Sequence, residues 1–275
     1  MINVVERLFE TGARTCAILV VAIAPMAIAA LVVASVLAVV HGTTLVDAAR
    51  FFQLGAATLG LALAGASLGL IIGGGAGLYT MEIATPGVRQ GVRALAGALH
   101  AVPAVGFGIV AAGGLLFAAH MPSVIVVFGV AATTLAINIG SIAFVQMRRE
   151  LASVPAGLRE AAAASGADPA TIALDVVLPS LRKRIAGLWW SLLATAMGEG
   201  VALQIIFASA LVARHVVSLH PSSVYGTYAT WLLEQGATQR DTALFALAPV
   251  ALALLGLTVA AVLIGRRAAG QVPWP

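Results

Sequence analysis

Long apolar runs separated by short polar segments dominate the pattern along this chain. A helix needs about 20 apolar residues to cross the roughly 30 Å of hydrocarbon in a bilayer. By that measure the pattern predicts membrane spans at about residues 16–40, 55–80, 96–119, 123–146, 185–211 and 243–265. We therefore expect an all-α fold, a polytopic helical bundle of about six transmembrane helices, with residues 1–275 as a single domain.

Composition supports the membrane class. The chain is 61% hydrophobic and 9% charged, whereas soluble domains carry about 25% charged residues. The first apolar run is too long for a cleavable signal peptide and is expected to stay as a span. Cys16 has no partner, and the five histidines lack metal-ligand spacing. We expect neither a disulfide nor a metal or cofactor held by this chain.

The distribution of basic residues predicts the orientation of the bundle. If both termini face the cytoplasm, twelve Lys and Arg residues lie inside and three (Arg50, Arg214 and Arg240) lie outside. This bias follows the positive-inside rule. We expect a multi-pass protein of the cell (inner) membrane with cytoplasmic termini, a cytoplasmic loop at 147–184 and an external segment at 212–242.

The cytoplasmic loop is the one sizeable piece that must lie in water, since it carries ten of the 26 charged residues. Its pattern predicts two short helices with a tight corner between them. The first carries residues 158–165, and Gly166 is placed to end it in a left-handed conformation. Asp168 then caps a second helix that Pro169 opens and Pro179 stops. Helices this short are marginal alone, so they require a partner surface.

The run Glu160-Ala161-Ala162, with Gly166 after it and Leu178-Pro179 further on, resembles the EAA loop of ABC importer permeases. In that family the small alanines let the helix lie in a groove of the cytoplasmic ATPase, and the glycine makes the bend. The resemblance implies a set of residues that couple the chain to an ATPase: Arg159, Glu160, Ala161, Ala162, Gly166, Leu178 and Pro179.

Two short helices around a corner are also the pattern of a DNA-binding helix-turn-helix. A recognition helix needs Arg, Lys, Asn or Gln for base edges and phosphates. Residues 170–178 offer only Thr171 and Asp175. We do not expect nucleic acid as a partner.

Glycines recur every fourth residue in the second predicted span, at Gly65, Gly69, Gly73 and Gly77. Such a face lets another helix approach closely. The run 65–69 also matches the Gly-x-Ser-x-Gly nucleophile elbow of hydrolases, which requires a strand-turn-helix and a nearby His and acid. Helix packing is the better explanation.

A carboxylate within the fifth span marks a candidate functional site. Insertion of a charged side chain at mid-span costs roughly 2.5 to 3.5 kcal/mol, so Glu199 is by default a functional hypothesis. The alternative is a Glu that only hydrogen-bonds across helices and sets their packing. Since the span supplies no cation, we expect either a basic residue from a partner subunit or a protonated Glu199. Near the third span, Pro103 and Gly106 loosen the backbone, for a cavity or merely for a packing kink.

These segments resemble the permeases of phosphate importers, which carry an aliphatic-Tyr-Leu-Glu ending like residues 78–82, a Val-Pro-Ser start and an Arg-Ala-aliphatic-Gly-Glu-Thr run. This chain has Ala104, Thr195 and Gly200 where that family has serine, arginine and threonine. The resemblance implies a substrate pathway lined by Pro103, Gly106, Thr195, Gly198 and Glu199. The implied cargo is phosphate or a related anion, or alternatively another oxyanion or a small polar solute.

The resemblance also implies partners: a second permease subunit, two cytoplasmic ATPase subunits, an external solute-binding protein and the lipid bilayer. The chain has no P-loop, so ATP and magnesium would be bound by the ATPases and the chain would be non-catalytic. Outside, Tyr225, Tyr228, Trp231 and Glu234 have near-helical spacing, for docking of the binding protein or for surface packing. A membrane-embedded enzyme or a scaffold is the alternative from another class. An enzyme would need a second titratable group beside Glu199.

Overall fold

The computed structural model describes residues 48–118, 123–213, 226–232 and 248–269. Within these residues every regular element is a helix, which confirms the expected all-α class. The first predicted span, at 16–40, lies outside the described residues.

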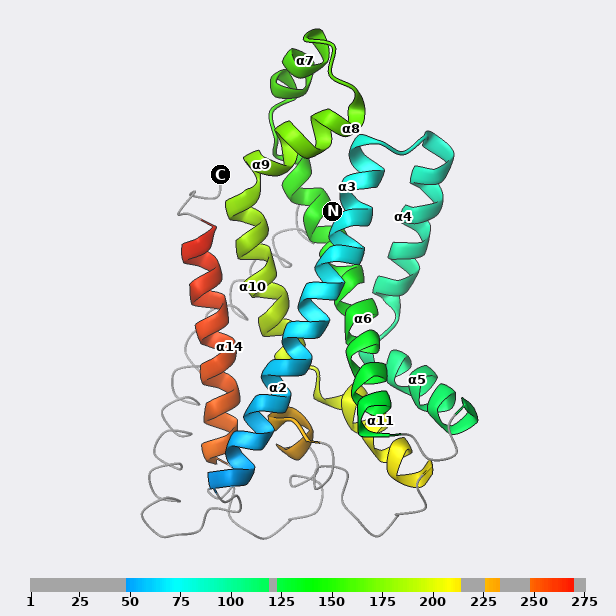
Figure 1. Cartoon of the computed structure of the whole chain (residues 1–275), viewed down its shortest axis with the longest axis vertical. Coiled ribbons are helices and arrows are strands. Elements are labelled where there is room, and N and C mark those ends of the chain that lie inside the picture. Colours follow the sequence, from blue (N-terminus) through cyan, green and yellow to red (C-terminus); the bar gives the residue numbers. More distant parts are fainter. Residues whose placement is uncertain (1–47, 119–122, 214–225, 233–247, 270–275) are drawn as a thin grey trace, which may run out of the picture.

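The helices are drawn in Figure 1. In chain order they are α2 (Ala48–Gly69), the π-helical η1 (Leu70–Gly74), α3 (Gly75–Glu82), α4 (Pro86–Ala101), α5 (Ala104–Ala118), α6 (Val124–Ala152), α7 (Ala156–Ala164), α8 (Pro169–Thr171), the π-helical η2 (Ile172–Val177), α9 (Leu178–Ser180), α10 (Arg182–Gly198), α11 (Gly200–Ala213) and α14 (Ala248–Ala268).

Three continuous helical runs in the described part are long and apolar enough to cross a membrane: Arg50–Glu82, Val124–Ala152 and Pro249–Ala268. They correspond to the second, fourth and sixth predicted spans. Two further pairs, α4 with α5 and α10 with α11, are long enough only when each pair is counted as one span, and they are bent by 93° and 51°. They correspond to the third and fifth predicted spans, and the sequence did not predict these angles.

The backbone leaves helical geometry at each bend. Val102, before Pro103, is extended with φ −76° and ψ 124°, as expected because the proline ring disfavours helical geometry in the preceding residue. Glu199 leaves the helical region at φ −75° and ψ 76°. The predicted third span began at residue 96, which instead lies inside α4.

The glycine face of α2, η1 and α3 packs against α6, as the sequence predicted. A Cβ atom added at Gly65 or Gly69 would lie 2.8 or 2.9 Å from a side chain of α6, and one at Gly77 would lie 3.2 Å from another. At Gly73 it would lie 1.8 Å from the backbone oxygen of Gly140. Helices α10 and α14 approach similarly, at Gly187 and Gly265.

Part of the predicted external segment is buried in the bundle. Tyr228 is 4% exposed and Trp231 is 5% exposed. The Tyr228 hydroxyl donates to the Phe51 carbonyl over 3.0 Å, and its backbone N–H donates to Thr58 Oγ1 over 2.8 Å. These two aromatic side chains are held against α2, so they do not form the exposed face expected for docking. Tyr225 and Glu234 lie outside the described residues.

Candidate functional site

Helix α7 stands at one end of the bundle, at the top of Figure 1. None of its nine residues is buried. Glu160 and Ala161 are exposed, Ala162 is half-buried, and Leu158 is 44% exposed. The predicted coupling helix is thus a short, alanine-rich helix that the described part of the chain does not cover.

The corner after α7 has the predicted geometry. Gly166 has φ +87°, a conformation that side chains other than glycine rarely adopt. Its N–H donates to the Ala163 carbonyl over 3.0 Å, and the Ala167 N–H donates to Ala162 over 3.2 Å. Together these hydrogen bonds close the C-terminus of α7 and turn the chain back toward the membrane bundle.

Asp168 caps the second helix, also as predicted. Its carboxylate accepts a hydrogen bond from the Thr171 N–H over 3.0 Å. Hydrogen bonds from the Thr171 side chain and then its backbone N–H lower the pKa of Asp168 below its ordinary value. The ionised carboxylate is therefore the form that holds the cap.

The second helix ends at Ser180, one residue after Pro179. After α8 it continues as η2 and α9 to Ser180, and the Leu181 N–H donates to the Val177 and Leu178 carbonyls over 3.3 and 3.2 Å. Pro179 is the second residue of α9 and is exposed, while Leu178 is half-buried.

The Arg159 side chain reaches from α7 to the end of α3. Its Nη2 lies 2.8 Å from Glu82 Oε1 and its Nε 3.1 Å from Glu82 Oε2. Its Nη1 and Nη2 also donate to the Val154 and Leu151 carbonyls, each over 2.8 Å. The Glu82 side chain is only 8% exposed. This pair anchors α7 to the end of α3, and a role of Arg159 in ATPase coupling stays a prediction.

Glu82 was absent from the predicted site, although it ends the segment that resembles the phosphate permeases. It lies 77 positions from Arg159, so only the fold brings the two together. A second ion pair lies at the base of the loop and joins the end of α6 to the start of α10. Arg184 Nη1 lies 3.5 Å from Glu150 Oε2 and also donates to Ser153 Oγ. The loop is therefore tied at its base while α7 remains exposed.

Within the bundle, Glu199 lies at the break between α10 and α11. Its Oε1 accepts a hydrogen bond from Asn138 Nδ2 of α6 over 3.1 Å, and the residue is half-buried. The described contact is thus a neutral amide from the same chain, and a protonated Glu199 or a cation from a partner subunit stays a prediction. Asn138 was missed, although an amide in the middle of an apolar span is a signal for a helix-to-helix hydrogen bond.

The other predicted pathway residues make contacts of their own. Thr195 is exposed, and its hydroxyl donates to the Ser191 carbonyl of its own helix over 3.1 Å. Gly198 is exposed next to Glu199. Pro103 and Gly106 form the start of α5, where the Gly106 N–H donates to the Pro103 carbonyl over 2.8 Å.

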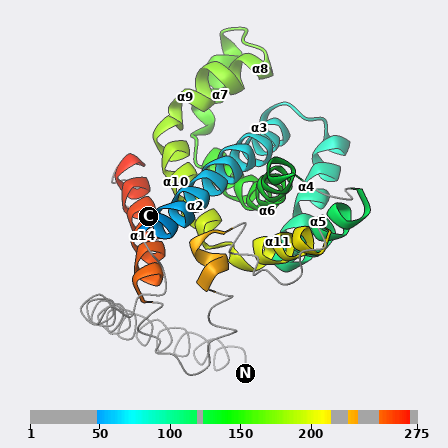
Figure 2. The ribbon, with the colours of Figure 1, turned by 60° about the horizontal axis from the view of Figure 1, so that its bottom comes forward.

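The two bent helix pairs, α4–α5 and α10–α11, contact each other through α5 and α11. Figure 2 shows α5 and α11 side by side at one edge of the bundle. A Cβ atom at Gly108 would lie 2.9 Å from the Cα of Ala202, so the two backbones are in close contact. On α11, Gln204 Oε1 is buried without a hydrogen-bond donor among the described residues. The predicted pathway segments at residues 103–106 and 198–199 therefore lie at the N-terminal ends of α5 and α11, two helices that contact each other.

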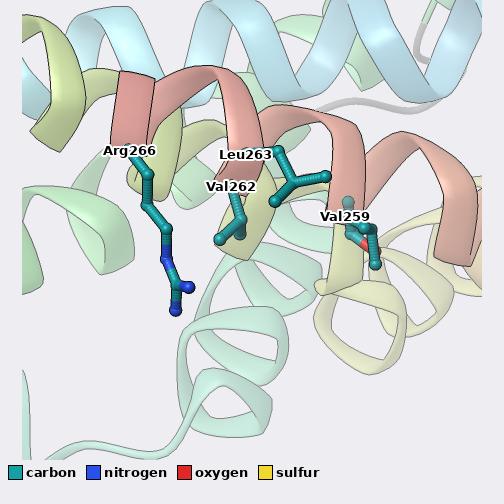
Figure 3. Close-up of a pocket in the computed structure, with 5 residues that line it drawn as sticks. Val259, Val262, Leu263 and Arg266 are labelled. Carbon is teal, nitrogen blue, oxygen red and sulfur yellow. The ribbon is translucent and has the colours of Figure 1, made fainter. Parts of the chain in front are cut away.

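An open apolar hollow of about 220 Å³ lies along α14, lined by Thr258, Val259, Val262, Leu263 and Arg266 (Figure 3). Its lining residues belong to a different helix from the Asn138–Glu199 contact, and we assign it no function. In the described part of the chain, no three His, Cys, Asp or Glu side chains come together as metal ligands would.

Comparison with known proteins shows a likeness in fold. No family model and no curated protein matches the sequence. Two crystal forms of the MetNI methionine ABC transporter in inward-facing conformations contain a similar chain. One, a selenomethionine soak, is 18% identical with a TM-score of 0.61, and the native form is 17% identical with a TM-score of 0.63. Each match covers 82% of this chain and 98% of the other.

Proposed function

We propose that this chain is the membrane-spanning permease subunit of an ABC importer, and that α7 is the helix that engages the ATPase. The observation that carries this proposal is that α7, a nine-residue helix at the end of a bundle of permease-like fold, has no buried residue. A helix this short needs a partner surface to be stable. Its exposed alanines suit close approach to a groove.

The Glu82–Arg159 pair gives this helix a mechanical connection to the bundle. Glu82 ends a continuous helical run from Arg50, and that run packs backbone-to-backbone on α6 at Gly73. A displacement of α7 would therefore act on α3 and then on α6, because close-packed helices transmit movement. In this role the chain is the non-catalytic translocation subunit, while ATP and magnesium are bound by two partner ATPases.

The remaining partners follow from the same role: a second permease subunit and an external solute-binding protein. The loop and both termini would face the cytoplasm. A cysteine at Ser165, in a Cys16→Ala background, should then react with an impermeant thiol reagent only in inside-out membrane vesicles. Labelling from the outer face would contradict this orientation.

For the cargo, we favour a small polar solute over phosphate. The phosphate permeases have an arginine where this chain has Thr195, and Thr195 bonds to its own helix. The Asn138–Glu199 contact supplies an amide and a carboxylate, and an ionised carboxylate repels an anion. Phosphate or another oxyanion remains the second candidate, on the likeness of the Gly198-Glu199 segment to those permeases.

The test of the role is assembly with the ATPase subunits. Ala161→Trp places a large side chain on the exposed face of α7 and should abolish co-purification of the ATPase while the chain still inserts into the membrane. Ala186→Trp, at an exposed position of α10, is the matched control. If Ala161→Trp co-purifies ATPase and stimulates ATP hydrolysis as the parent does, α7 is not the engaging helix.

A further inference from the structure

Three arginines lie on two helices that pack together, α4 and α6. Arg93 and Arg89 of α4 are close enough to Arg148 of α6 to repel its charge. The Arg148 guanidinium carbon lies 5.7 Å from the centre of the Phe144 ring. Arg89 donates from Nη2 to the Ala84 carbonyl over 3.2 Å. We call these three residues the arginine cluster.

The cluster is not neutralised by the described residues. The two acids at the neighbouring helix ends, Glu82 and Glu150, form ion pairs with Arg159 and Arg184. The Nε atoms of Arg89 and Arg148 are buried and have no hydrogen-bond partner within the described structure. Like charges held together with unused donors create a strong preference for an anion.

The place of the cluster indicates which anion. Arg89 lies in the first turn of α4, just after the α3–α4 connection, and Arg148 lies near the end of α6 that leads into α7 (Figure 1). This end of the bundle carries the loop at 147–184, and the helices leave the hydrocarbon there. Beside the arginines, α4 exposes Val88, which is 45% exposed, and Leu95, which is 62% exposed. The surface thus combines positive charge with apolar side chains directed outward.

We propose that the arginine cluster binds the phosphodiester headgroup of an anionic phospholipid in the adjacent leaflet, with the acyl chains against the exposed apolar side chains of α4. Guanidinium groups donate paired, charge-assisted hydrogen bonds to phosphate oxygens. Basic pockets between membrane helices on the cytoplasmic side bind such headgroups. A free phosphate ion would use the arginines but would leave Val88 and Leu95 without a partner. The proposal needs only that the chain spans a membrane, so it does not depend on the transport role.

The experiment compares lipid selectivity of the full chain in vesicles that contain spin-labelled phosphatidylglycerol or spin-labelled phosphatidylcholine. The parent should retain phosphatidylglycerol preferentially. The triple variant Arg89→Gln, Arg93→Gln, Arg148→Gln should lose most of this preference, by about fivefold for each arginine that contacts the headgroup. The control removes the same charge at exposed basic positions of the same end: Arg182→Gln, Lys183→Gln, Arg267→Gln.

Equal loss of selectivity in the triple variant and the control would overturn the proposal, because net charge would then explain the effect. Release of the labelled lipid by inorganic phosphate, at constant ionic strength, would assign the cluster to the free ion and would also overturn it. Loss of subunit pairing in the triple variant, without a change in lipid selectivity, would overturn the proposal as well. If the triple variant does not fold, Arg93→Gln alone, at an exposed position, must still lower the preference.

Discussion

Gly73→Ala tests the closest backbone contact in the bundle. The added Cβ would lie 1.8 Å from the Gly140 oxygen, 2.6 Å from its carbonyl carbon and 2.9 Å from its Cα. Ordinary contacts between non-bonded heavy atoms are about 3.5 to 4.0 Å. All three obstacles are backbone atoms, so no rotamer change relieves the clash. Helix α6 must move away from η1 by about 1.5 Å or more.

This displacement weakens the packing on both sides of Gly73. Inserting an extra methyl into a well-packed core typically costs about 1 to 3 kcal/mol. Because the obstacle is backbone, we place Gly73→Ala at the upper end, near 3 kcal/mol. For a domain of 150 to 250 residues this corresponds to a thermal midpoint lower by roughly 6 to 12 °C.

The assay is thermal unfolding of the purified chain in detergent, with Gly75→Ala as the matched control. Gly75 belongs to the same helical run and is exposed, and a Cβ atom there meets nothing within 4 Å. Alanine should raise stability at this position, by up to about 1 kcal/mol through helix propensity. The two variants should therefore shift the midpoint in opposite directions. A Gly73→Ala midpoint equal to that of the parent would refute the close-packing argument.

Three further predictions concern the loop and the buried acid. Gly166→Val should lower ATPase stimulation through backbone strain of about 1 to 3 kcal/mol. Gly166→Asn should retain stimulation, because asparagine tolerates the left-handed conformation. Equal ATPase stimulation in both variants would contradict the left-handed corner. Glu199→Gln keeps an acceptor for Asn138, so assembly should be normal while transport changes by about tenfold if the charge contacts the solute; transport at the parental rate would reduce Glu199 to a packing role. Because the pKa of Asp168 is lowered, its cap should persist above the ordinary aspartate value of about 3.9 and weaken as pH falls below it; amide exchange of Thr171, corrected for intrinsic rates, should show this step, and Asp168→Asn should remove it.

Local features of the loop could be predicted because their causes are local. The left-handed Gly166 and the Asp168 cap depend on hydrogen bonds that span three to five residues, and both were found as expected. The glycine face was also predictable, since a four-residue period places Gly65, Gly69 and Gly73 on one side of a helix. The period does not name the partner, however, and only the structure identifies α6.

Breaks within the spans could not be placed by hydropathy, because α4–α5 and α10–α11 are apolar on both sides of their bends. The sequence did suggest loosened backbone at Pro103, but not the angle of 93°. Pro179 was expected to stop its helix, which ends one residue later, at Ser180.

The sequence by itself determined the membrane class, the all-α fold and the two-helix loop, because hydropathy and turn chemistry act over one span or one turn. Only the tertiary structure decided that Arg159 pairs with Glu82 and that Asn138 donates to Glu199, across 77 and 61 positions. A charged or polar side chain in an apolar helix shows that it needs a partner. Which partner it finds depends on how the helices pack, and that is set by contacts such as Gly73 on Gly140.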